Sequence, residues 1–185
     1  MGLKLNGATS GSIELDVPDA IGSDVSGVLL PTTAGTLDRL ERAGNILQVV
    51  YGNTSSQVSL TTTTYVDSNL TATITPSSTT SKVLVLVDQS CQWNHSSAGG
   101  MAVRLLRNST VIEQPPETSV PLSDYIASAT QHYFKLPMTV LDSPSTTSAV
   151  TYKTQGRVWA GVAAEFQAGS TTKGVSRIVL MEVAG

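Results

Sequence analysis

The sequence predicts an all-β protein: an antiparallel jelly-roll β-sandwich with a short N-terminal β arm and one short helix. Short apolar alternations of period two recur along the 185 residues, and turn clusters rich in Gly, Pro, Ser and Asn separate them, as in sandwiches. Only 14% of the residues are charged, and Ser and Thr stand where a helical surface would carry Glu and Lys. No helical period of useful length follows Gly44, so the crossover helices of a parallel sheet are absent.

Residues 1–44 are predicted to form an arm. Two short alternations, residues 12–17 and 28–30, each predict a small strand that ends at a proline. A hairpin of this size buries too little to be stable alone, so we expect it to dock on the body, on a second copy or on another protein. The candidate docking residues are Ile13, Leu15, Val17, Val28, Leu29 and Leu30.

Residues 36–44, TLDRLERAG, predict the short helix. Thr36 suits the N-cap, Leu37 and Leu40 share one face, and Gly44 suits a left-handed stop. Two turns are not stable by themselves. We therefore predict a hinge or plug, which ends the arm at residue 44 and leaves residues 45–185 as a jelly-roll head domain.

The centre of the predicted core is residues 69–87. Leu70, Ala72 and Ile74 alternate with threonines, as in a half-buried strand. After a polar turn, the unbroken run VLVLV at residues 83–87 predicts a second strand that faces the first and is covered on both of its own faces. This second strand is predicted to continue to residue 93. The other predicted strands are residues 46–51, 57–65, 101–107, 111–113, 125–141 (with a break), 148–155, 161–166 and 177–183.

Motifs for catalysis or metal binding are missing from the sequence. The single cysteine, Cys91, excludes an internal disulfide and a multi-cysteine zinc site, and it is predicted to be a small buried hydrophobe. Neither His95 nor His132 has a partner at ligand spacing. No nucleophile elbow or phosphate-binding glycine loop occurs. We therefore predict no enzyme, no cofactor and no metal site.

Charge and hydropathy restrict the partners. The net charge of −3 gives no basic surplus for a phosphate backbone, so nucleic acid is not an expected partner. No apolar run approaches 18 residues, so no membrane insertion is expected. The N-terminus has no secretory pattern, and we expect synthesis in a cytoplasm.

Two tryptophans, Trp93 and Trp159, stand out because aromatics make up only 5% of the chain. Trp93 and His95 fall where a strand ends and a loop begins, which could present both to a carbohydrate or a protein. We favour the alternative that the tryptophans fill the core or a subunit interface, as is usual in sandwiches.

The arm, with GSIELDVP at residues 11–18 and LLPTTAGTL at residues 29–37, resembles a unit of structural proteins of tailed bacteriophages, marine and cyanobacterial ones especially. There the unit is often part of a tail fibre. The body, with SKVLVLV at residues 81–87 and IVLMEV at residues 178–183, is similar to the jelly-roll heads of such proteins. Those heads resemble the tumour necrosis factor fold and are usually trimeric.

The resemblance implies a non-enzymatic structural protein on the exterior of a phage virion, synthesised in the host cytoplasm. It implies a homotrimer attached through the arm to other virion proteins of the capsid or tail, either as a short tail fibre or as a capsid decoration (cement) protein. The alternative is a lectin-like receptor-binding module for a host-surface glycan. That alternative predicts exposed aromatics around Trp93, whereas a structural protein buries them at subunit contacts.

Overall fold

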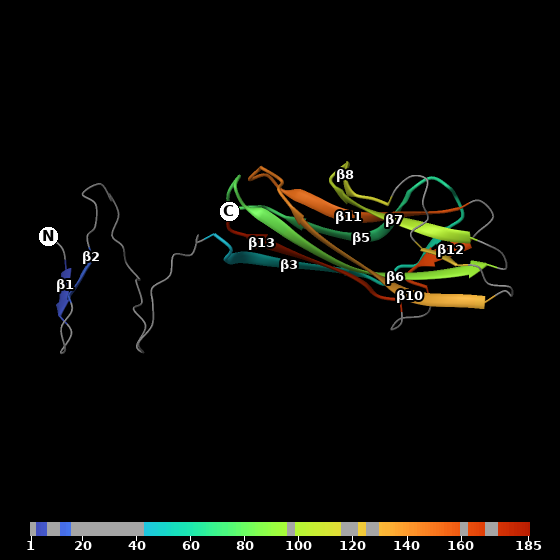
Figure 1. Ribbon diagram of the computed structural model, residues 1–185, viewed down its shortest axis with the longest axis horizontal. Helices are drawn as coiled ribbons and strands as arrows, with labels where there is room; N and C mark the ends of the chain where they lie inside the picture. Colours follow the sequence, from blue (N-terminus) through green and yellow to red (C-terminus); the bar gives the residue numbers. More distant parts are fainter. Residues whose placement is uncertain are drawn as a thin grey trace. The chain divides into compact units, whose positions relative to one another are not determined.

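Figure 1 shows the computed structural model of the chain, which describes residues 3–6, 12–15, 43–95, 99–115, 122–124, 130–159, 163–168 and 174–185. The chain divides into two compact units, Met1–Asp38 and Arg39–Gly185. In the first unit, β1 (Leu3–Asn6) pairs antiparallel with β2 (Ser12–Leu15). The strand predicted at residues 12–17 is thus present as β2, but its described partner, β1, was not predicted. Residues 17 and 28–30 lie outside the described residues.

The second unit is a sandwich of two antiparallel sheets, which Figure 1 shows as two layers. One sheet has six strands, β3 (Ile46–Thr54), β4 (Val58–Leu60), β6 (Lys82–His95), β10 (Thr130–Asp142), β12 (Ala163–Phe166) and β13 (Ser176–Val183). The other has five, β5 (Val66–Ile74), β7 (Gly99–Arg107), β8 (Thr110–Glu113), β9 (Leu122–Asp124) and β11 (Val150–Val158). The all-β antiparallel prediction is confirmed, whereas the jelly-roll connectivity stays a prediction.

No helix occurs among the described residues. The predicted short helix falls largely on residues 36–42, which lie outside the described part. Ala43 and Gly44 form a turn, and Gly44 has a φ of +90°, the left-handed conformation predicted for it.

β6 is the central strand of the six-stranded sheet. It pairs with β10 along its whole length on one side, and on the other side with β13 and then with β12. Its inward side chains Val83, Val85 and Val87 are buried against the five-stranded sheet, together with Leu70 and Ile74 of β5. β5 and β6 therefore lie in opposite sheets and face each other across the core. The prediction that the run 83–87 is covered on both faces is wrong for the described chain, because Leu84 and Leu86 point outward and are only half-buried.

Glu182 is a carboxylate on the buried face of β13. It is fully buried, and it accepts hydrogen bonds from Gln48 Nε2 (2.5 Å), the Ser77 backbone N–H (2.7 Å) and Ser77 Oγ (2.6 Å). Burial by itself raises the pKa of Glu182, but the hydrogen bonds from Gln48 and Ser77 outweigh it and lower the pKa to about 2. The ionised carboxylate therefore ties β3 and the turn after β5 to β13.

Glu182→Gln is expected to weaken the acid sensitivity of the head. Because the folded pKa is depressed, the stabilisation is present above the ordinary pKa of 4.5 and is lost as the pH falls toward about 2. Between pH 7 and pH 3 the wild type should lose about 2 kcal/mol more free energy of unfolding than the variant. Urea titrations at the two pH values measure this difference. Glu113→Gln, at an exposed position, is the control, and an equal loss in all three proteins would contradict the role of Glu182.

Candidate functional site

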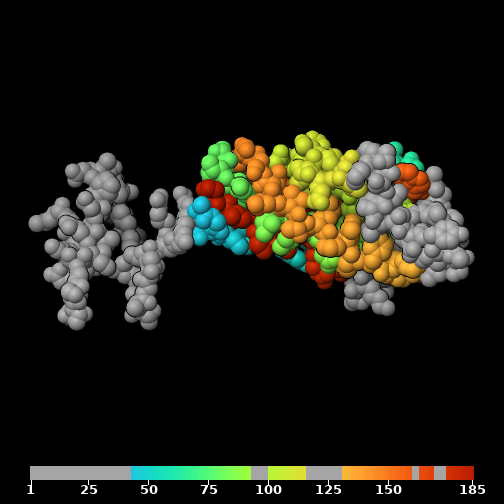
Figure 2. Space-filling model, viewed as in Figure 1, coloured from blue at the N-terminus to red at the C-terminus, as the bar shows by residue number. Residues whose placement is uncertain are grey.

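The outer face of the six-stranded sheet carries two rows of largely apolar side chains, each crossing four neighbouring strands. One row is Tyr51, Val179, Leu86 and Thr139. The next row is Val49, Met181, Leu84 and Leu141. We refer to these two rows as the apolar face. In Figure 2 the atoms of β3 (cyan) lie beside those of the C-terminal segment (red), the two strands at one border of this face.

Much of the apolar face is open to solvent. Val49, Tyr51 and Leu141 are 58%, 54% and 55% exposed, and the central residues on β6 and β13 are half-buried. β3 and β10 are edge strands, since among the described strands each pairs with one neighbour. A contiguous apolar patch beside open sheet edges is typical of a surface that another chain covers.

The outer face of the five-stranded sheet is mostly polar and internally bonded, although it also carries Ala102 and Leu106, which are buried. Asp67 accepts hydrogen bonds from Gln155 Nε2 (2.7 Å) and Lys153 Nζ (3.0 Å). Burial raises the pKa of Asp67, but these two bonds outweigh it and the net pKa is lowered. Arg104 donates to Gln155 Oε1 (2.6 and 2.9 Å) and lies 4.0 Å from the centre of the Tyr65 ring. This face suits water, so the two outer faces of the sandwich differ in kind.

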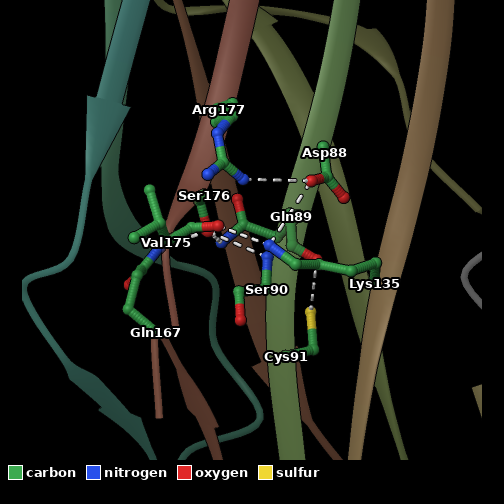
Figure 3. Close-up of polar contacts among 9 residues, drawn as sticks. All are labelled: Asp88, Gln89, Ser90, Cys91, Lys135, Gln167, Val175, Ser176 and Arg177. Atoms are coloured by element: carbon green, nitrogen blue, oxygen red, sulfur yellow. Dashed lines mark hydrogen bonds and ion pairs between the residues drawn. The ribbon is translucent and has the colours of Figure 1, made fainter. Parts of the chain in front are cut away.

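An ion-pair cluster borders the apolar face (Figure 3). Asp88 lies 3.4 Å from Lys135 Nζ and 3.7 Å from Arg177 Nη1, and Lys135 also donates to the Val175 carbonyl. These side chains are 40% to 48% exposed, so each pair contributes little to stability. Their effect is to divide the outer face into an apolar half and a polar half.

A buried polar network lies directly behind the cluster (Figure 3). Gln89 donates through Nε2 to Ser176 Oγ (2.9 Å) and accepts from Thr154 Oγ1 (2.7 Å). Thr154 Oγ1 is 2.5 Å from Ser68 Oγ, and the Gln167 amide oxygen accepts from Ser176 Oγ (2.8 Å). Because Gln89 and Thr154 belong to opposite sheets, the network fixes the register of one sheet over the other.

The polar half of the outer face contains a hollow of about 380 Å³. Four of its lining residues form one row across β4, β12, β6 and β10, namely Ser59, Glu165, Gln92 and Tyr133. Its other lining residues are Thr61, Gln131, Ala163 and Ala164. The sequence analysis did not single out these residues, since they come from four separated segments and match no motif.

The structure places only part of the predicted site. Trp93 and His95 lie on β6, where they pair with His132 and Thr130 of β10, but their side chains lie outside the described part. Ile13 and Leu15 lie on β2, whose side chains are likewise not described. Surface recognition by the first pair and docking by the second therefore stay predictions.

The exposed fractions of Cys91 and Trp159 bear on two other predictions. Cys91 is buried as predicted, and burial raises the pKa of its thiol well above the ordinary range. Trp159 is 42% exposed, so the prediction that it fills the core is wrong, whereas a place in a subunit interface is untested.

Two searches of the described residues complete the description of the site. No group of three or more His, Cys, Asp or Glu side chains there could hold a metal ion. No helix there is long and apolar enough to cross a membrane.

No protein-family model and no curated protein matches the sequence. Among solved structures, the chain is similar to one in infectious bursal disease virus, Gt strain, with 13% identity, a TM-score of 0.40, and coverage of 96% of this chain and 46% of that one. For the T13 particle of that virus, the identity is 15% and the TM-score is 0.37, and the match covers 94% of this chain and 42% of that one. For dimeric latent PorU from Porphyromonas gingivalis, the identity is 12% and the TM-score is 0.31, and the match covers 73% of this chain and 13% of that one. The chain thus spans less than half the length of each, and likeness of this size assigns no function.

Proposed function

We propose that this chain is a non-enzymatic structural protein on the exterior of a virus particle. The observation that carries the proposal is the difference between the two outer faces of the sandwich. One is polar and bonded within itself, whereas the other presents the apolar face beside two open edges. A chain built in this way works by packing against other chains.

The proposed assembly is a homotrimer held by the apolar face. Covering its seven apolar side chains would contribute roughly 1 kcal/mol for each of the three that are more than half exposed, Val49, Tyr51 and Leu141, and less for each of the four half-buried ones. That total is enough to offset much of the entropy lost on association. Three copies are proposed because the heads that the body resembles are usually trimeric.

The proposed anchor is the N-terminal arm, which would attach the trimer to other virion proteins. Its support is that, among the strands that the structure describes, β1 pairs only with β2, since a two-stranded ribbon by itself is marginal in water and needs a partner surface. The resemblance to tailed-phage proteins allows a short tail fibre or a capsid decoration protein. These two forms differ in where the arm binds, at the tail or on the shell.

Removal of residues 1–35 is expected to leave a folded head that does not join the particle. The head keeps both sheets, so its circular dichroism spectrum and melting temperature should match those of the full chain. Particles assembled in cells that produce only the truncated chain should lack it, which immunoblotting of purified particles measures. Normal incorporation of the truncated chain would remove the arm from the proposal.

The alternative function is a lectin-like head that binds a host glycan. The specific observation in its favour is the hollow beside Tyr133, which combines polar and apolar lining residues and lies at the opposite end of the outer face from the apolar half. Assembly and glycan binding use different residues, so one chain can perform both.

A further inference from the structure

We propose that the hollow on the outer face of the six-stranded sheet binds a neutral sugar. Its central row of side chains offers a carboxylate, an amide and an aromatic ring on three adjacent strands, contributed by Glu165, Gln92 and Tyr133. Directly paired residues on neighbouring strands have Cβ atoms about 4.5–5.5 Å apart, so all three can reach one sugar ring. The inference rests on the glycan-binding alternative and not on virion assembly.

Gln92 carries the argument. It is only 6% exposed, yet its side-chain amide forms no hydrogen bond with any other residue that the structure describes. The amide is not among the buried side-chain atoms that lack a hydrogen-bond partner, so it reaches the open space of the hollow, where a bound molecule can meet it. The Gln92 amide lines the hollow, so a ligand there can supply both a donor and an acceptor. A sugar hydroxyl is both at once.

Glu165 complements this amide. Its half-buried carboxylate pairs with Gln92 across β12 and β6, and it forms no ion pair with the described cations. An ionised carboxylate accepts hydrogen bonds and cannot donate. One hydroxyl of a sugar can therefore donate to Glu165 while its neighbour on the ring accepts from Gln92 Nε2. The hydroxyl of Ser59, paired with Glu165 on β4, extends the same row.

Tyr133 supplies an apolar wall. The residue is 59% exposed, and its hydroxyl donates to Gln131 Oε1 (3.0 Å), which holds the ring in place. An aromatic ring anchored through its polar end presents a rigid flat surface at low entropic cost. The C–H face of a pyranose fits such a surface, because its hydroxyls project from the rim of the ring.

The charge and the volume of the hollow restrict the class of ligand that it can bind. Glu165 is the only charged residue among the described lining residues, so an acidic sugar would bring a second negative charge beside it without a cation to compensate. The volume of about 380 Å³ lies near the lower end of the range of about 300–1,000 Å³ for small-molecule sites. The hollow thus suits one or two neutral sugar rings.

Saturation-transfer NMR on the intact chain tests this inference. The probes are glucose, galactose and N-acetylglucosamine at millimolar concentration, with N-acetylneuraminic acid as the charge control. Transfer is expected to at least one neutral sugar and not to the acid. Gln92→Leu and Glu165→Ala should each raise the dissociation constant roughly tenfold or more, because each removes a hydrogen bond to the sugar. Tyr133→Ala should abolish transfer.

Tyr51→Ala is the matched control, because Tyr51 lies on the same outer face with similar exposure, 54%, but outside the hollow. Tyr51→Ala should change self-association and leave sugar binding intact. The variants at Gln92, Glu165 and Tyr133 should lose sugar binding and keep self-association. Transfer to no neutral sugar, equal transfer to the acid, or binding that survives Gln92→Leu would each overturn the inference. None of these results depends on the number of copies in the assembly, so the failure of either proposal leaves the other standing.

Discussion

Val85→Asp is expected to unfold the head. Val85 is fully buried on β6, where it pairs with Leu180 of β13 and Val140 of β10. Burial of a valine side chain contributes roughly 1.5–3 kcal/mol, and an unpaired buried carboxylate costs several kcal/mol more, against a total stability of about 5–15 kcal/mol for a typical domain. One such charge therefore removes most of the margin.

Thermal melts at matched protomer concentration measure this effect, because assembly by itself stabilises the fold through mass action. The control is Thr71→Asp, which places the same charge at an exposed position on the outer face of the five-stranded sheet, opposite Lys153. Its midpoint should stay near that of the wild type. Equal midpoints for the two variants would show that Val85 is not in the core and that the strand register assigned to residues 69–87 is wrong.

The strands of the head were predictable because their alternation is strong. The hydroxyl-rich positions of β5, such as Thr71 and Thr73, are exposed, and the apolar positions between them are buried. The break predicted within residues 125–141 is not found in the described part of that range, where β10 runs without interruption from Thr130 to Asp142. β5 begins at Val66, four residues before the strand predicted from Leu70, and a bulge with Asn69 at a φ of +65° lies within it.

The double cover expected for residues 83–87 shows what sequence cannot decide. Val83, Val85 and Val87 point inward and Leu84 and Leu86 outward, and both sets are apolar. Such a run predicts that both faces of the strand are apolar, but it does not predict what covers each face. The structure supplies one cover, the five-stranded sheet, and leaves Leu84 and Leu86 on the other face half-buried.

The polar sites escaped prediction because their partners are far apart in sequence. Gln48 and Glu182 are separated by 134 positions, and the hollow combines residues from four strands. One signal was present in the sequence. Glu182 shares its parity with Ile178 and Leu180, which places it on the buried face of the strand. Nothing comparable marked Gln92, whose neighbour Trp93 was the more conspicuous residue.

Leu84→Glu is expected to convert the assembled protein into single, folded chains. Leu84 lies at the centre of the apolar face, between Met181 and Leu141, and its side chain points away from the core. In the free chain a glutamate there remains hydrated and costs the fold little. In the assembly it would be taken out of water without a partner, which costs several kcal/mol per copy, and each 1.4 kcal/mol weakens association about tenfold.

Light scattering coupled to size-exclusion chromatography measures the mass of each species. The wild type should give three copies and Leu84→Glu one, with unchanged circular dichroism. Thr71→Glu, which adds the same charge to the polar outer face, should remain at three. Leu84 and Val85 are adjacent on one strand, so the two positions separate assembly from folding. A charge at residue 84 should prevent assembly, whereas a charge at residue 85 should prevent folding. A wild-type mass of one copy, or three copies in Leu84→Glu, would mean that the apolar face is covered by something other than this chain.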